Sequence, residues 1–304
     1  MKELIVRQAS RERLDKYILS HSDIQSRSQV KKMFDESKVY VNNELKKSGY
    51  QVNFGDKIQY ILPDKPLEYI VPQEMPINIV YEDEDLIVIN KPQGMVVHPG
   101  AGNFDKTLVN ALKFHTNNLS NLSGENRLGI VHRIDKNTSG LLVVAKNNET
   151  HIALQKQIQT KECKRFYMAL LYGILKEKSG IIDKNLKRST KNRTQIEVCP
   201  KGEGREAITL YNVLQEFSGY SLVNFELKTG RTHQIRVHAK SIGHPVVGDD
   251  VYAPNIKNKF STNGQLLHAY KIQFTHPRKN KFMSFEIPLP DYFEKIINFL
   301  ENQM

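Results

Sequence analysis

The chain has 304 residues, of which 39% are hydrophobic and 25% charged, and its formal net charge is +11. This composition supports a folded core and excludes a disordered or fibrous protein. The first residues, MKELIVRQASRERLDKY, carry charges throughout, and no apolar run approaches the ~18 residues of a membrane span, so we expect neither a secretory signal nor a membrane helix. Two cysteines, Cys163 and Cys199, are too few for a disulfide scaffold, and we expect a reducing, cytoplasmic compartment.

The excess positive charge is concentrated in two segments. Residues 1–62 hold 12 basic and 8 acidic side chains, residues 161–205 hold 12 basic and 5 acidic ones, and the remainder of the chain is balanced. A local excess favours a polyanionic partner, either nucleic acid or an acidic membrane surface. Solvated faces of helices and loops are the alternative explanation.

Two short helices and a small sheet are predicted at the N-terminus. Apolar residues recur at helical spacing on both sides of a polar break at 21–23, namely Leu14, Tyr17, Ile18, Val30, Met33 and Phe34. Short strands follow around an Asn42-Asn43 turn. The pattern resembles the S4 RNA-binding domain over residues 11–62, and the resemblance implies RNA contacts by Arg27, Lys31 and Lys32 on the polar side of the second helix. A purely structural appendage is the alternative.

Residues 63–76 carry four prolines without a sustained period, which predicts an extended linker. A second domain is predicted over 77–304. Its strands are interspersed with helical patterns near 107–114 and 150–159 at irregular spacing. We therefore predict an α+β fold with a mixed, largely antiparallel sheet flanked by helices and loops.

Side chains suited to catalysis are most concentrated in residues 129–147, GIVHRIDKNTSGLLVVAKN. Asp135 lies between an apolar strand predicted at 129–131 and a second strand predicted at 141–145. A carboxylate on such a turn is held rigidly but stays reachable, which suits a nucleophile or a general base. The alternative is that Asp135 only caps the turn by accepting backbone hydrogen bonds.

The same segment resembles the RluA family of pseudouridine synthases, whose motif HR-[LI]-D-xx-TSG-LL is matched by residues 132–142. The resemblance continues through CKRFYMALLYG at 163–173, ELKTGRTHQIRVHAKSIGHPVVGDDVY at 226–252 and LLHAYKIQFTHP at 266–277. An S4 domain ahead of this catalytic domain is similar to the arrangement in ribosomal large-subunit members of the family. The resemblance implies isomerisation of uridine in RNA without metal or cofactor.

Residue roles follow from the resemblance. Asp135 matches the catalytic aspartate, with attack on ribose C1′, addition to uracil C6 and removal of the 2′ proton all open as its action. Arg231 matches the arginine that pairs with that aspartate, and Arg133 the arginine that enters the RNA stack; His132 lies beside Arg133 in the motif and is grouped with it as RNA-binding. Tyr167 matches the active-site tyrosine that packs on the flipped uracil.

Five other residues of the matched segments are interpreted less specifically. Arg236 and His238 alternate with apolar residues as on a strand, which predicts ordinary outward-facing polar positions. Either Leu266 or Leu267 supplies an apolar floor beneath the base. Phe166 is expected on the opposite face of the strand from Tyr167.

Other signals are weaker. The histidines show neither HxxxH nor HExxH spacing, so no metal site is expected, and no glycine-rich nucleotide motif is found. The basic stretch 176–205 is predicted to contact RNA phosphates.

The predicted function is a site-specific RNA pseudouridine synthase, with 23S ribosomal RNA favoured as partner and pre-ribosomal particles as a further setting. A tRNA or dual-specificity synthase, a catalytically silent ribosome-associated RNA-binding protein and a base glycosylase are the alternatives. A monomer is expected, because heptads and large apolar surface runs are missing from the sequence.

Overall fold

The computed structural model describes residues 1–8, 11–22, 24, 27–62, 70–100, 103–192 and 194–303, with the backbone alone described at 27–29 and 32. The chain divides into two compact units, Met1–Tyr69 and Ile70–Met304. In the part of the chain so described, no helix combines the length and apolar character that crossing a bilayer requires.

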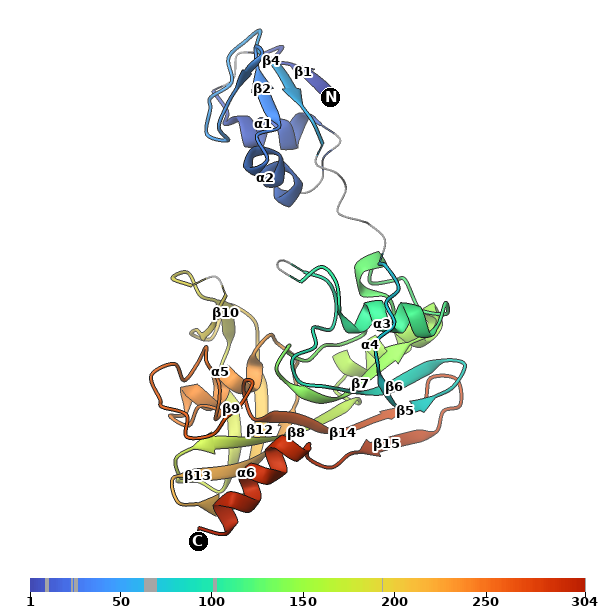
Figure 1. Cartoon of the computed structure of the whole chain (residues 1–304), viewed down its shortest axis with the longest axis vertical. Helices are drawn as coiled ribbons and strands as arrows, with labels where there is room; N and C mark the ends of the chain where they lie inside the picture. The colour runs from blue at the N-terminus through green and yellow to red at the C-terminus, as the bar shows by residue number, and fades with distance from the viewer. Residues whose placement is uncertain are drawn as a thin grey trace. The chain divides into compact units, whose positions relative to one another are not determined.

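The N-terminal unit is the predicted helix pair with a small sheet (Figure 1). Helices α1 (Leu14–His21) and α2 (Arg27–Asp35) pack against four strands in the order β1 (Lys2–Ile5), β4 (Lys57–Tyr60), β2 (Val39–Val41) and β3 (Glu44–Leu45). Asn42 and Asn43 both have positive φ, 52° and 68°, as a tight two-residue hairpin turn requires. Strand β1, which precedes the predicted domain of residues 11–62, also belongs to this unit, because it pairs with β4 along its whole length.

The boundary after this unit also differs from the prediction. Residues 63–69 of the predicted 63–76 linker lie outside the described residues. Ile70 is 3% exposed within the core of the second unit, and the amide of Asn110 donates to the carbonyl oxygen of Val71 at 2.9 Å. Residues 70–76 therefore belong to the second unit rather than to a linker.

The second unit is built on a nine-stranded sheet (Figure 1). The order is β5-β6-β7-β14-β8-β13-β12-β9, with β15 paired to β14. The strands are β5 (Asn78–Glu82), β6 (Leu86–Lys91), β7 (Ser139–Ala145), β8 (Lys164–Tyr172), β9 (Ser179–Asp183), β12 (Ile208–Phe217), β13 (Tyr220–Leu227), β14 (Leu267–Thr275) and β15 (Phe282–Glu286). Only β7 and β14 pair in parallel within this sheet, which confirms the predicted mixed, largely antiparallel architecture.

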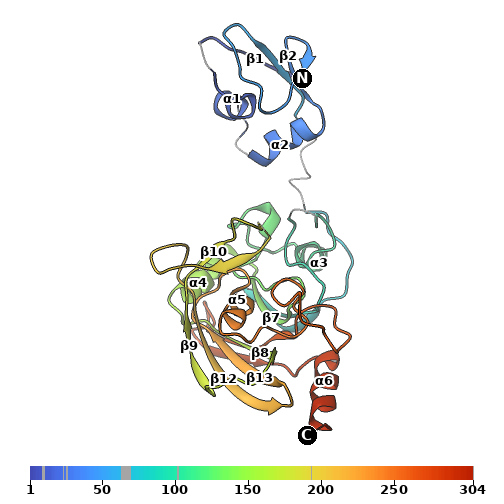
Figure 2. The ribbon, with the colours of Figure 1, turned by 90° about the vertical axis from the view of Figure 1, so that its left-hand side faces the viewer.

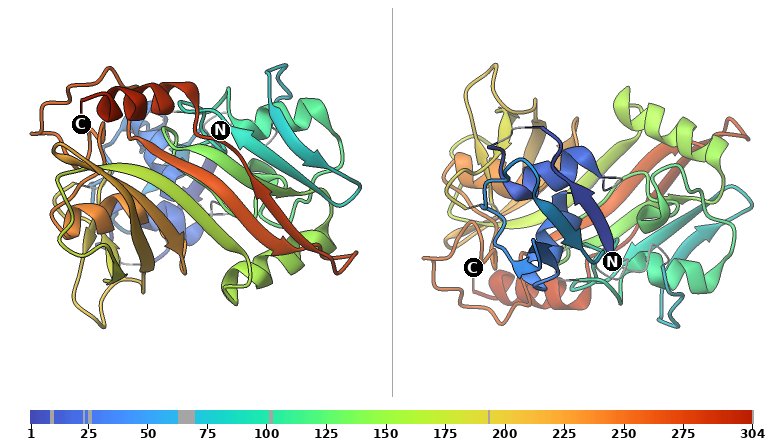
Figure 3. Two further views of the ribbon diagram at one scale, coloured as in Figure 1. Left: turned by 90° about the horizontal axis from the view of Figure 1, so that it is seen from below. Right: turned by 90° about the horizontal axis from the view of Figure 1, so that it is seen from above.

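Both faces of the sheet are covered by helices (Figure 3). Apolar residues of α3 (Leu108–His115) and α5 (Gln234–Ser241) pack into one core cluster with alternate residues of β6, β7, β8 and β13. The intervening residues of these strands face α4 (Asn148–Gln159) and α6 (Asp291–Glu301) instead. A short 3-10 turn, Glu125–Arg127, and a separate hairpin of β10 (Leu186–Arg188) and β11 (Ile196–Val198) complete the unit. The helices predicted near 107–114 and 150–159 are confirmed as α3 and α4.

Helix α5 was predicted as a strand, and that prediction is wrong. Ile235 and Val237 alternate with Arg236 and His238, but all of them are buried, because α5 lies on the inner side of the curved strands β9, β12 and β13 (Figure 2). Where every side of a short helix is buried, its sequence carries no amphipathic period to distinguish it from a strand.

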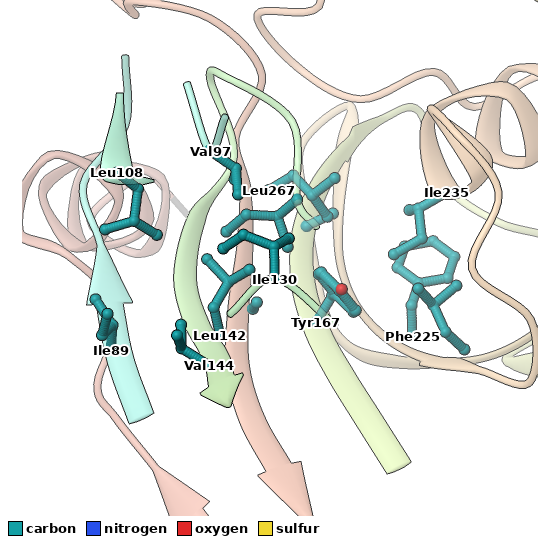
Figure 4. Packing of buried hydrophobic residues seen from close by; sticks show 14 of the residues in the cluster. Ile89, Val97, Leu108, Ile130, Leu142, Val144, Tyr167, Phe225, Ile235 and Leu267 are labelled. Carbon is teal, nitrogen blue, oxygen red and sulfur yellow. The ribbon is translucent and has the colours of Figure 1, made fainter. Parts of the chain in front are cut away.

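The principal core lies between the sheet and the α3/α5 layer (Figure 4). Ile89, Leu142 and Val144 pack near one end, and Phe225 with Ile235 near the other. Tyr167 and Leu267 lie between these groups. This core holds the strands from which the candidate site is built.

Candidate active site

A cavity of about 450 Å³ opens on the α3/α5 side of the sheet. Its wall is formed by the loop 131–135, by β8 and by the segment 227–236 that leads into α5. Asp135, Tyr167 and Arg236 all line it. The sequence segments that carry these residues lie far apart in the chain, and the sheet brings them together.

Asp135 lies on an ordered loop rather than between two strands. The strand predicted at 129–131 is reduced to a single bridge from Ile130 to Val144. Behind the loop, Gln265 donates to the hydroxyl of Thr138 at 3.0 Å, and the Nζ of Lys91 donates to the carbonyl oxygen of Lys136 at 3.1 Å. Asp135 is therefore held from both sides while 17% of its side chain stays exposed.

Gly140 allows β7 to approach β14 directly after this loop. Its φ is +113°, and a Cβ there would lie 2.3 Å from the carbonyl oxygen of Ala269. Only glycine tolerates both the positive φ and the close backbone contact. The conformation fixes the point at which the Asp135 loop enters the sheet.

The side chain of Lys91 is completely buried beneath the loop. Its Nζ also donates to the carbonyl oxygens of Pro92 at 2.7 Å and Met95 at 2.8 Å. Burial lowers the pKa of Lys91 to about 7, against the opposing effect of the Asp135 charge. Lys91 thus ties the segment after β6 to the residue that follows Asp135.

Arg236 is the partner of Asp135. Its Nη1 lies 3.1 Å from Oδ2 of Asp135, while its Nε and Nη2 bind the two oxygens of Asp249 at 2.6 and 2.8 Å. The side chains of Arg236 and Asp249 are 5% and 0% exposed. Burial would lower the pKa of Arg236, but the bonds to Asp249 and Asp135 raise it above its ordinary value. Asp249 therefore fixes a permanent cation against Asp135.

The predicted pairing of Arg231 with Asp135 is wrong. Arg231 lines the cavity, but its Nε donates to the backbone oxygen of Glu206 at 2.9 Å. The prediction that Arg236 and His238 face outward is also wrong. Both residues lie on helix α5 and are buried in the protein. His238 shares hydrogen bonds with the hydroxyl of Thr209 at 2.9 Å and the carbonyl of Lys184 at 3.0 Å.

The two residues of the HR pair differ sharply. Arg133 is exposed at the cavity wall, in keeping with the predicted entry into RNA, which stays a prediction. The Nε2 of His132 accepts a hydrogen bond from the amide of Val143 at 3.1 Å. Burial, together with the charge of Arg165, lowers the pKa of His132 to about 3. His132 thus holds the loop against β7 as a neutral ring. Because its Nε2 already accepts the hydrogen bond from Val143, this atom is not available to contact RNA.

Tyr167 lies in the cavity wall with 5% of its surface exposed. Burial raises the pKa of its hydroxyl to about 12. Phe166 faces the opposite side, as predicted, and packs against Tyr270. Of the two candidate floor residues, Leu267 lines the cavity, whereas Leu266 is buried with α6.

The predicted RNA-binding residues of the N-terminal unit are described only in part. Lys31 is exposed on α2. The side chains of Arg27 and Lys32 lie outside the described residues. Their contact with RNA stays a prediction.

Sequence reasoning missed Arg165, which lines the cavity, and Asp249, which binds Arg236 behind the cavity wall. Asp249 lies in the GDDVY segment, which was matched only as part of a longer resemblance. Arg165 precedes Tyr167 by two positions, so strand periodicity places both on one face of β8. That spacing was the available signal.

A group of metal-ligand type lies elsewhere. Asp83, Asp85 and His276 bring ligand atoms within 4.8 Å of one another. Both carboxylates already form ion pairs. The Nζ of Lys279 lies 2.7 Å from Oδ2 of Asp83, and the Nε of Arg278 lies 2.7 Å from Oδ2 of Asp85. The group is an ion-pair cluster that joins the β5–β6 turn to the turn after β14.

Comparisons with known proteins agree with this geometry. Residues 85–241 match the family model described as RNA pseudouridylate synthase, and residues 12–58 match the S4 domain. The uncharacterized RNA pseudouridine synthase YlyB of Bacillus subtilis is 42% identical over 286 residues, which cover 94% of this chain and 93% of that protein.

Two further relatives carry a more specific name. Proteins named ribosomal large subunit pseudouridine synthase D are 38% identical in Nitrosomonas europaea, covering 95% of this chain and 85% of that protein, and 43% identical in Zymomonas mobilis, covering 75% and 74%. The structure of human RNA pseudouridylate synthase domain containing 1 has the same fold, with a TM-score of 0.57 at 24% identity over 79% of this chain and 98% of that one.

Proposed function

Because the chain belongs to the RNA pseudouridylate synthase family, we propose that Asp135 is the catalytic carboxylate of its isomerisation of uridine in RNA, and that large-subunit ribosomal RNA is the substrate. The enzyme is an RNA pseudouridine synthase, an isomerase. The observation that carries the role of Asp135 is its position in the cavity, bound by the buried Arg236 at 3.1 Å.

A second carboxylate in the cavity wall is a poorer candidate. Glu206 also lines the cavity, but its side chain is exposed. Asp135 is held by a guanidinium that is itself fixed by Asp249, so its orientation is defined before substrate binds. Such preorganisation is what a nucleophile or a general base needs.

The other cavity residues suit a flipped base. Tyr167 offers an aromatic ring and Leu267 an apolar surface in the same wall. An enzyme that acts on a base in folded RNA must extrude it, at a cost of a few kcal/mol that stacking in the pocket offsets. Arg133 is exposed at the cavity wall, and this position supports the proposal that it fills the space that the base leaves.

The reaction needs no net transfer of atoms to the protein. The C1′–N1 bond breaks, uracil rotates, a C1′–C5 bond forms, C5 loses its proton and N1 gains one. Asp135 can serve by attack on C1′, by addition to C6 or by removal of the 2′ proton. In each case Arg236 keeps a cation beside the carboxylate.

The support for ribosomal RNA comes from relatives named ribosomal large subunit pseudouridine synthase D and from the S4 domain. The test compares ribosomal RNA and tRNA from cells with and without the gene, by reverse-transcription stops after carbodiimide treatment. We expect at least one stop in large-subunit RNA to disappear with the gene. Loss of a stop in tRNA alone would contradict the proposal that ribosomal RNA is the substrate.

The role of Asp135 is tested with Asp135→Asn on an RNA fragment that contains the mapped uridine. The rate of isomerisation should fall by at least about 1000-fold with RNA affinity nearly unchanged, because the amide cannot act as nucleophile or base. Retained activity would remove Asp135 from catalysis. Release of free uracil by the unaltered enzyme would indicate a glycosylase instead.

A further inference from the structure

Arg165 is a buried cation in the cavity wall that the proposed function does not use. It lies on β8, paired in register with Leu227 of β13 and Ile272 of β14, and its exposed fraction is 5%. Strand periodicity places its side chain on the same face as that of Tyr167. Both side chains line the cavity.

The guanidinium of Arg165 has no protein partner in the described parts of the chain. Its Nε and Nη2 are sealed from solvent and make no hydrogen bond there, and none of the carboxylates described lies within ion-pair distance. Arg236, equally buried, has bonds to two carboxylates. An arginine cannot lose its proton in a protein, and burying an unpaired charge is costly. The position of Arg165 therefore favours a partner from outside the described part of the chain, such as a bound substrate.

One nitrogen of Arg165 remains accessible. Nη1 is not among its sealed nitrogens, and it lies against the backbone of Gly230, another residue of the cavity wall. A Cβ at Gly230 would lie 2.7 Å from Nη1, closer than such atoms can approach. The absence of a side chain at position 230 therefore leaves the space through which Nη1 reaches the cavity.

The charge of Arg165 acts on the ring that would pack on the base. Burial dominates the raised pKa of Tyr167, but the positive charge of Arg165 opposes it. Arg165 lies deep beside this ring, whereas Arg133 and Lys161 are exposed in the same wall. Phosphates stay at the surface of a bound RNA, so the exposed cations suit them and the buried one suits the inserted base.

We propose that Arg165 is a further catalytic residue, whose Nη1 donates a hydrogen bond to a carbonyl oxygen of the flipped uracil and stabilises the negative charge that the ring acquires during the reaction. The inference rests on the proposed function. When the C1′–N1 bond breaks, its electron pair stays on N1 and spreads to O2 and O4. The pair is used again when C5 bonds to C1′ and the C5 proton leaves. Addition to C6 likewise places negative charge on O4.

Arg165→Met tests the proposal, with Lys164→Met, an exposed neighbour on the same strand, as the matched control. The single-turnover rate at saturating RNA should fall about 100- to 1000-fold in Arg165→Met, as when one preorganised donor to a developing oxyanion is removed. Its RNA dissociation constant should change less than about threefold, because the lost contact is strongest after binding. The control should keep both values.

The melting temperature separates catalysis from structure. Removing an unpaired buried cation should raise the melting temperature of the free protein in Arg165→Met. A fall in both melting temperature and rate would indicate a structural role and overturn the proposal. A higher dissociation constant with a smaller salt dependence and an unchanged saturated rate would indicate a phosphate contact, which also overturns it.

Gly230→Ala provides an independent variant that retains the arginine. Its Cβ should displace Nη1 and slow the reaction at least tenfold, yet cause no further loss when combined with Arg165→Met. Additive losses would contradict the shared mechanism. If the unaltered enzyme forms no pseudouridine, the proposed function fails; if it does and Arg165→Met keeps the full rate, only the role of Arg165 fails.

Discussion

The second unit, Ile70–Met304, which we call the catalytic unit, contains two groups of cations that are neutralised in different ways. In the cavity, Arg236 is held between Asp135 and Asp249 with side-chain exposures of 5%, 17% and 0%. Around the β10–β11 hairpin, Lys187 pairs with Glu203 and Lys201 with Asp183, at 2.7 and 2.8 Å, on the exposed surface. Surface pairs contribute little to stability and weaken with salt, whereas a buried pair has one geometry and a high cost of disruption.

This difference suits the two groups to different tasks, the cavity to catalysis and the hairpin to electrostatic attraction of RNA. The cavity can orient a carboxylate because its charges cannot rearrange without losing their only compensation. The predicted contact of the hairpin with RNA phosphates would cost little, because its lysines exchange surface partners easily. The variants below test the contrast in order of decreasing expected effect.

Asp249→Asn should have the largest effect. It leaves Arg236 with half of its bidentate partner, so we expect the isomerisation rate to fall about 10- to 100-fold and the free energy of unfolding by about 3 kcal/mol. Single-turnover kinetics and denaturant unfolding measure the two effects. Asp250→Asn changes the exposed neighbour and should alter neither. Equal effects at both positions would refute the positioning role of Asp249.

Acidification should destabilise the catalytic unit through its buried histidines. The pKa of His132 is lowered to about 3, mainly by burial, so the unfolded chain binds a proton below its ordinary pKa near 6.5 while the native ring stays neutral. The contribution is fully present above about pH 6.5 and is lost, at up to about 1.4 kcal/mol per pH unit, as the pH falls toward 3. The unfolding free energy of His132→Gln should depend less steeply on pH between 4 and 6.5. An identical slope in both proteins would contradict this assignment.

Basic residues of the hairpin region should affect RNA affinity alone. Lys191 and Arg205 are exposed, and their replacement by Ala should raise the dissociation constant about threefold each, with a decrease of about 0.7 in the salt slope per lost phosphate contact. Fluorescence anisotropy at several salt concentrations measures both quantities, and the saturated rate should not change. Lys295→Ala on α6 is the control. A change in the saturated rate would place the hairpin region in the chemistry.

Lys31→Ala in the N-terminal unit should have the smallest effect. Lys31 is exposed on α2 and would contact one phosphate at most, so we expect about a twofold rise in the dissociation constant. The isomerisation rate at saturating RNA should stay the same. No change in affinity for any RNA tested would remove Lys31 from the predicted contacts.

Elements with a clear local signal were predictable. Helix α4 buries one side and exposes the other, and the Asn42-Asn43 turn has residues that accept positive φ. The positions of Asp135 and Tyr167 in one cavity followed from family motifs. The failures concern α5, which is buried on all sides, and β1, which is too short and mixed to show a period.

Local patterns were therefore sufficient for the fold class, because periodicity and turn chemistry act within a few residues. The S4 domain and the catalytic role expected of Asp135 came from the resemblance to known families. Local patterns could not decide which of two nearby arginines binds Asp135. Nor could they show that Arg165 is buried without a partner among the described residues. Both depend on the direction in which α5 and β8 present their side chains to distant segments. Packing sets that direction, and only the tertiary structure contains it.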